Sequence, residues 1–162
     1  MIDRVTTATQ SGKLVEAQAP VIISASRSTD IPAFYSDWFI NRLREGYVVW
    51  RNPFNQQPMY ISFKTTKVVV FWTKNPKPLI PYLHELDERG IHYYFQITLN
   101  DYEKERFEPN VPKLSERIET FKLFSDKIGK EKTIWRFDPL ILTSLLSPRE
   151  FLNRIWHIGN QL

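Results

Sequence analysis

The feature that most constrains this chain is a repeated succession of a short apolar run, a polar turn and an amphipathic helical segment. β-Branched and aromatic residues fill the runs at 21–23, 47–51, 67–72, 92–99 and 133–142. Apolar residues at helical spacing follow at 31–45, 79–89, 115–128 and from 148 onward. Strands that alternate with helices in this way are typical of parallel sheets, because each helix carries the chain back across the sheet.

The sequence therefore predicts an α/β fold, a partial (β/α) TIM-like barrel of parallel strands. A closed barrel needs more than five strands, so we expect an incomplete one whose C-terminal part is missing. We expect the barrel domain to span 21–162, after an N-terminal arm at 1–20 that is extended or forms a strand pair. Segment 58–63 is predicted to be an extra antiparallel strand. The five core strands should end at one rim.

Charge and aromatic content leave two kinds of partner open. The chain has 22 Lys and Arg against 18 Asp and Glu, a net charge of +4, which suits a phosphate-bearing partner but is also common in enzymes. Aromatic residues make up 14% of the chain and can stack on bases or fill a core. The substrate is therefore expected to be a small molecule or a nucleic acid.

Cysteine and histidine usage limits the cofactors that this chain can hold alone. It contains no cysteine, which excludes a disulfide or a cysteine-ligated iron–sulfur cluster. Its three histidines have no metal-ligand spacing, so we expect no metal site. No apolar run is long enough for a membrane span and the first twenty residues lack a signal-peptide core, so we expect a cytoplasmic protein without a membrane partner.

Polar residues after the first predicted strand form the first part of a candidate site. Arg27, Thr29 and Asp30 lie close to the start of a helix, where an anionic group is favoured. Asp30 could instead only cap this helix, with Pro32 in the first turn, and Arg27 could only pair with Asp30. Asn52 directly follows the second predicted strand, and this position makes it another candidate site residue.

The third strand leads into Lys74 and Asn75 after a strongly apolar run. A lysine in such surroundings reaches into a cavity or meets an acid, and it can bind a carboxylate or a phosphate. The alternative is a solvated loop lysine. On the fourth strand, Gln96 and Thr98 share one face and could bind a polar ligand or make polar contacts inside the barrel.

Arg136 and Asp138 share a face of the fifth strand, two residues apart. Charges in a strand interior are costly unless they have partners, so the two residues bridge each other or receive a ligand. Asp138 can neutralise one of the cations Arg27, Lys74 and Arg136, but not all three. We therefore expect the cavity to carry a net positive charge.

Several motifs in order resemble those of domain of unknown function family 1848. The motifs are SASRSTDIPAFY at 24–35, RNPFN at 51–55, FWTKNP at 71–76, YFQITL at 94–99 and WRFDP at 135–139. The resemblance covers residues 21–162. Members of that family are longer and have a cysteine cluster in their C-terminal part, similar to the iron–sulfur ligands of radical S-adenosylmethionine (SAM) enzymes. This chain stops before that part.

A more distant resemblance is to the radical SAM barrel of spore-photolyase-like enzymes. It rests on the order of Thr73-Lys74, Ile97-Thr98, Glu108-Pro109, Pro112, Arg117 and Pro139. In that barrel the strand ends bearing the lysine and the threonine line the cofactor cavity. Where those relatives have three cysteines after the first strand, this chain has Arg27, Ser28 and Thr29.

The two resemblances imply a radical-SAM-like iron–sulfur enzyme, with a 4Fe–4S cluster and SAM bound by the full-length protein and no cofactor held by this chain alone. They imply that the candidate residues bind cofactor or substrate, with no catalytic residue assigned. Two alternatives stay open. One is a nucleotide- or nucleic-acid-binding barrel without radical chemistry, and the other is an inactive fragment.

Overall fold

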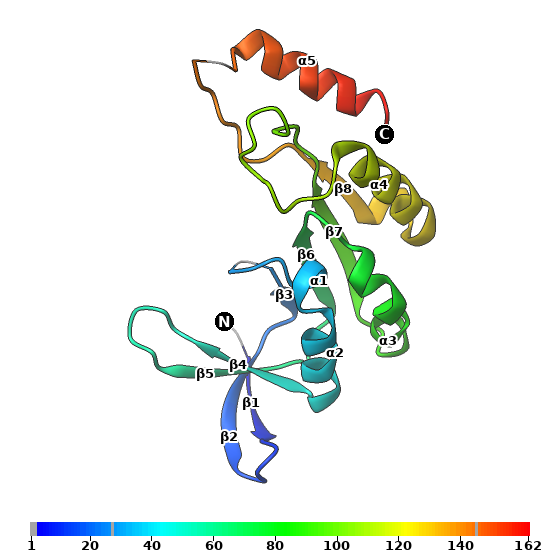
Figure 1. The fold of residues 1–162 in the computed structure, drawn as a ribbon. Helices are drawn as coiled ribbons and strands as arrows, with labels where there is room; N and C mark the ends of the chain where they lie inside the picture. The colour runs from blue at the N-terminus through cyan, green and yellow to red at the C-terminus, as the bar shows by residue number, and fades with distance from the viewer. Residues whose placement is uncertain (1–2, 27, 145) are drawn as a thin grey trace.

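The computed structural model describes residues 3–26, 28–144 and 146–162. In these residues the strands form two four-stranded sheets, which lie next to each other in Figure 1. The first sheet has the order β1 (Asp3–Ala8), β2 (Leu14–Ala19), β5 (Pro58–Ser62) and β4 (Tyr47–Arg51). The second has the order β3 (Ile22–Ser24), β6 (Val68–Thr73), β7 (His92–Thr98) and β8 (Thr133–Arg136).

The second sheet is parallel throughout, as the alternating pattern predicts. Its register pairs Ser24 of β3 with Val70 of β6, and Thr98 of β7 with Arg136 of β8. The mixed α/β class with parallel strands is therefore confirmed. The described strands do not close a barrel, because β3 and β8 remain the two edges of an open sheet.

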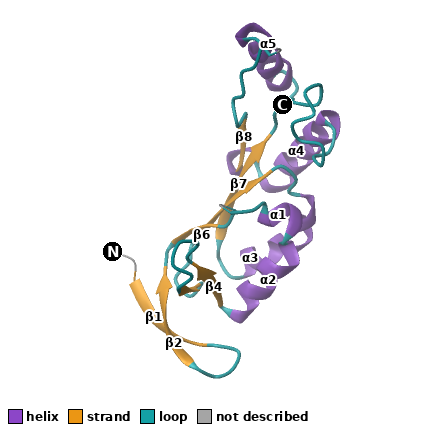
Figure 2. Ribbon diagram, turned by 60° about the vertical axis from the view of Figure 1, so that its left-hand side comes forward, coloured by secondary structure: helices purple, strands orange, loops and turns teal. Residues whose placement is uncertain are grey.

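Helices cover one face of the parallel sheet and leave the other face open (Figure 2). The helical elements are α1 (Ile31–Phe34), α2 (Ser36–Glu45), η1 (Lys77–Tyr82), α3 (Leu83–Glu88), α4 (Leu114–Ile128), η2 (Lys130–Lys132) and α5 (Pro148–Gly159). Phe71 and Phe95 stack on the covered face with ring centroids 4.8 Å apart, and Phe124 of α4 meets Phe95 edge-on at 4.5 Å. All three side chains are fully buried, so this aromatic stack forms the centre of the core.

One predicted core strand belongs to the other sheet. Residues 47–51 form β4, which pairs antiparallel with β5 rather than joining the parallel sheet, so that prediction is wrong. The connection at 52–57 is too short for a crossover between parallel strands, and it turns as a hairpin. The predicted extra antiparallel strand at 58–63 is confirmed as β5.

Residues 3–19 form the strand pair that was one of two expectations for the N-terminal segment. β1 and β2 are antiparallel, and Gln18 of β2 pairs in parallel with Ile61 of β5. None of the helices in the described ranges has the length and apolar character that a membrane crossing requires.

Two predicted elements are shorter in the structure than in the sequence pattern. The helix expected over 31–45 is divided into α1 and α2 at Tyr35, whose ψ of 28° leaves the helical range. The strand expected over 133–142 ends at Arg136, and the chain continues as a loop. The predicted start of α5 is confirmed, since the Ser147 hydroxyl accepts a hydrogen bond from the backbone N–H of Glu150.

Candidate functional site

A polar cleft of about 450 Å³ lies at the carboxyl ends of the parallel strands. It is lined by residues at the ends of β6, β7 and β8 and in the segments that follow β3, β6, β7 and β8, as expected for a site in a parallel sheet. We call it the strand-end cleft. Seven of the predicted site residues line it: Thr29, Asp30, Lys74, Asn75, Thr98, Arg136 and Asp138.

Asp30 connects two of the strand ends. Its Oδ1 accepts a hydrogen bond of 3.0 Å from the backbone N–H of Ala33, which caps α1. Its Oδ2 accepts a second bond of 2.7 Å from the backbone N–H of Lys74, at the end of β6. The capping role that the sequence left open is therefore present, and the same carboxylate also holds the Lys74 backbone in place.

Lys74 is half-buried, with 27% of its side chain exposed, and its ammonium forms an ion pair with Glu108. Burial lowers the pKa of Lys74 to about 8, the charge of Arg117 adds to this shift, and Asp30 and Asp138 oppose it. The contact with Glu108 also favours the charged form. Lys74 is therefore an ammonium at neutral pH, and it is not the solvated loop lysine of the alternative reading.

Arg136 lies at the end of β8 and stacks on an aromatic ring. Its guanidinium carbon is 4.4 Å from the ring centre of Trp72, which belongs to β6 on the other side of β7. Its Nη2 donates a hydrogen bond of 3.2 Å to Asp138. The ion pair proposed from the sequence is thus formed, while both side chains also line the cleft.

The expected net positive charge of the cleft does not hold for the described residues. Lys74 faces Glu108 and Arg136 faces Asp138, so each of these two cations has a carboxylate partner. The sequence pattern marked Glu108 only as part of a motif, and it gave no sign that a residue 34 positions away would meet Lys74. The third cation of that expectation, Arg27, lies outside the described residues.

Sequence reasoning also missed the lining residues Ser26 and Phe34. The Ser26 hydroxyl oxygen is buried and has no hydrogen-bond partner among the described residues. Phe34 is an exposed apolar side chain at the end of α1. The run of small polar residues after β3 was the one available signal for Ser26, because such a run permits close approach to a ligand.

Two predicted site residues lie elsewhere. Asn52 follows β4 and its side chain accepts a hydrogen bond of 2.9 Å from the backbone N–H of Phe54, so it stabilises the hairpin turn. Its prediction depended on β4 joining the parallel sheet, which it does not. Gln96 lies on the open sheet face beside Trp72, two residues before Thr98, and it is not part of the cleft lining.

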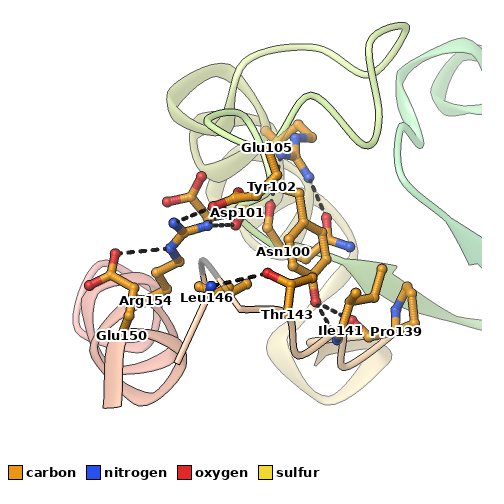
Figure 3. A network of polar contacts seen from close by, with 11 residues as sticks. Asn100, Asp101, Tyr102, Glu105, Pro139, Ile141, Thr143, Leu146, Glu150 and Arg154 are labelled. Atoms are coloured by element: carbon orange, nitrogen blue, oxygen red, sulfur yellow. Dashed lines mark hydrogen bonds and ion pairs between the residues drawn. The ribbon is translucent and has the colours of Figure 1, made fainter. Parts of the chain in front are cut away.

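A buried polar network supports the loops on one side of the cleft (Figure 3). Asn100 is fully buried and donates a hydrogen bond of 3.1 Å to the backbone oxygen of Asp138. Arg117 donates to the side chain and backbone oxygens of Asn100 at 3.2 and 2.9 Å. These contacts join the loop after β7, which carries Glu108, to the loop after β8, which carries Asp138.

Arg154 attaches α5 to the same network (Figure 3). Its guanidinium donates two hydrogen bonds of 2.8 Å to the carboxylate of Glu105, and both side chains are more than nine-tenths buried. Another of its bonds goes to the backbone oxygen of Asp101. The bonds from Arg154 lower the pKa of Glu105, while burial opposes the shift.

Fold and cleft together define an α/β protein with a polar site at the strand ends of a parallel sheet. Residues 22–162 match the family described as Domain of unknown function (DUF1848), so the chain belongs to that family. No curated protein and no solved structure matches the chain.

Proposed function

We propose that the strand-end cleft binds a small molecule through a carboxylate or phosphate group. The observation that carries this proposal is that Lys74 and Arg136, from two different strand ends, line one cleft with Thr98. Ammonium and guanidinium groups form strong charge-assisted hydrogen bonds with such anions. The buried hydroxyl of Ser26, which has no hydrogen-bond partner in the described part of the chain, offers a further donor or acceptor in the same wall.

SAM is the first candidate ligand, because the resemblance to radical SAM enzymes implies it. The methionine part of SAM carries a carboxylate and an ammonium group. Lys74 and Arg136 suit the carboxylate, and Asp138, more than half exposed at the cleft, suits the ammonium. A lining with both signs of charge therefore supports a zwitterionic ligand better than a plain anion.

The residues of this chain do not fit the iron–sulfur cluster that the same resemblance implies. Such clusters are held by cysteine thiolates, and the 162 residues contain no cysteine. The ligands of a 4Fe–4S cluster would have to come from residues outside this sequence. The proposal is therefore limited to ligand binding and includes no radical step.

A nucleotide is the second candidate ligand, and Phe34 is the observation that favours it. This exposed aromatic side chain lines the cleft together with Trp72, and bases stack on such rings. A nucleoside monophosphate would place its phosphate at Lys74 and Arg136. SAM shares the adenosine group, so the two candidates differ mainly in the charged part.

Titration calorimetry with SAM, with adenosine monophosphate and with inorganic phosphate tests the proposal. We expect SAM or adenosine monophosphate to bind with one site per chain. Lys74→Met and Arg136→Met should each weaken this binding by about 1.5–3 kcal/mol, the range for hydrogen bonds to charged groups. The melting temperature should stay nearly unchanged.

Lys77→Met is the matched control, because Lys77 is exposed on η1 and is not part of the cleft lining. It should bind like the unmodified chain. The proposal is wrong if none of the three probes binds. It is also wrong if both cleft variants lose stability while ligand affinity is retained, since the two cations would then be structural.

A further inference from the structure

A second cavity, of about 840 Å³, lies where α2 meets the β4–β5 hairpin. Of the described residues, only Ser28 and Thr29 line both this cavity and the strand-end cleft. Its volume is within the range of small-molecule sites, about 300–1,000 Å³. We call it the hairpin cavity, and the function proposed above does not use it.

Aromatic side chains form much of the wall of the hairpin cavity. Trp38 and Phe39 come from α2, Trp50 from β4, and Phe63 follows β5. Phe39 and Phe63 are buried and meet edge-on with ring centroids 6.2 Å apart, so the inner wall is firmly packed. Trp38 and Trp50 are 45% and 40% exposed, which leaves large apolar surfaces open to a ligand.

Arg42 is the charged residue of this wall among the residues that the structure describes. It is half-buried, and its guanidinium has no hydrogen bond or ion pair within the described part of the chain. Arg44, two residues later on the same helix, is different, because it binds Glu85 through two bonds of 2.6 and 3.0 Å. An unpaired cation beside apolar walls is costly unless an anion meets it.

We propose that the hairpin cavity binds an aromatic acid, a molecule with a flat ring system and one acidic group. The rings contact the aromatic wall, where stacked and edge-on arrangements are favourable. The acidic group pairs with Arg42, whose planar fork matches a carboxylate or sulfonate. The size of the cavity suits a ligand with two or more rings.

A matched pair of fluorescent probes tests this proposal. 1-Anilinonaphthalene-8-sulfonate has the required rings and acidic group, and N-phenyl-1-naphthylamine has the same rings without the sulfonate. We expect the sulfonate probe to bind at one site per chain. Arg42→Met should weaken its binding about 10-fold or more and leave binding of the uncharged probe unchanged.

Two further variants distinguish the contribution of the aromatic wall to probe binding from the contribution of the Arg42 charge. Trp50→Ala should weaken both probes about fivefold, because it removes an aromatic contact that both share. Arg51→Met is the control, since Arg51 is the next residue of β4 and is exposed, but is not part of the cavity lining. It should change neither affinity. Circular dichroism melting curves should confirm that all three variants fold.

Three results would overturn the proposal. The first is that Arg42→Met weakens both probes equally, which would mean that the charge of Arg42 plays no part. The second is that neither Arg42→Met nor Trp50→Ala changes binding of the sulfonate. The third is a dimer in sedimentation experiments that Trp50→Ala dissociates, since a second copy of the chain would then be the occupant.

Discussion

At the scale of single residues, Lys74 should make the proposed ligand binding in the strand-end cleft dependent on pH. Its pKa of about 8 means that it is an ammonium below this pH and a neutral amine above it. We expect the affinity for adenosine monophosphate to be constant from about pH 7 to 7.5 and to fall as the pH rises through 8, because the cation that meets the phosphate is lost. Titration calorimetry between pH 7 and 9.5 measures this.

Lys74→Met provides the control for this dependence. The variant should bind weakly at every pH, without the fall near pH 8, because it lacks the amine that titrates there. A variant that retained the full pH dependence would show that another group titrates in this range. Lys74 would then have no role in the effect.

At the scale of elements, the Arg154–Glu105 pair holds α5 against the loop that follows β7. Arg154→Met leaves the carboxylate of Glu105 buried without its partner, which typically costs about 3 kcal/mol or more. We expect this loss in the free energy of unfolding in urea. Circular dichroism of the helices follows the transition.

Arg149 offers a matched control on the same helix, because it is exposed at the start of α5. Arg149→Met should change stability by less than about 0.5 kcal/mol. The double variant Arg154→Met with Glu105→Gln should recover part of the loss, since it no longer buries an unpaired charge. Equal stability of the Arg149 and Arg154 variants would contradict the role given to the pair.

At the scale of the whole molecule, the open face and free edges of the parallel sheet favour association. Ile22, Trp72 and Ile134 are exposed on the face opposite the helices, and β3 and β8 each have one unpaired edge. Exposed apolar patches and free strand edges promote contacts between chains. We expect sedimentation velocity to show association between micromolar and millimolar concentrations.

Ile134→Lys should keep the chain monomeric, because it places a charge on the open face of the edge strand β8. Leu123→Lys is the comparison, since Leu123 is also an exposed apolar residue but lies on α4, away from that face. It should associate like the unmodified chain. A chain that stays monomeric at the highest concentration would contradict the prediction.

The sequence by itself determined much of the local structure and seven of the residues that line the strand-end cleft. The helix starts after Asp30 and at 148 depend on residues within three positions of each other, so the local pattern was sufficient to predict them. Lys74, Thr98 and Arg136 were found because parallel strands bring their carboxyl ends to one edge.

Only the tertiary structure decided which sheet each strand joins and which charges meet. β4 has the composition of a core strand, but its short loop and its pairing with β5 place it in the other sheet, together with Asn52. The contacts of Lys74 with Glu108 and of Asp30 with the Lys74 backbone join residues 34 and 44 positions apart. Such contacts depend on the free energy of packing the whole chain, whereas caps and periodic patterns depend on a few neighbouring residues.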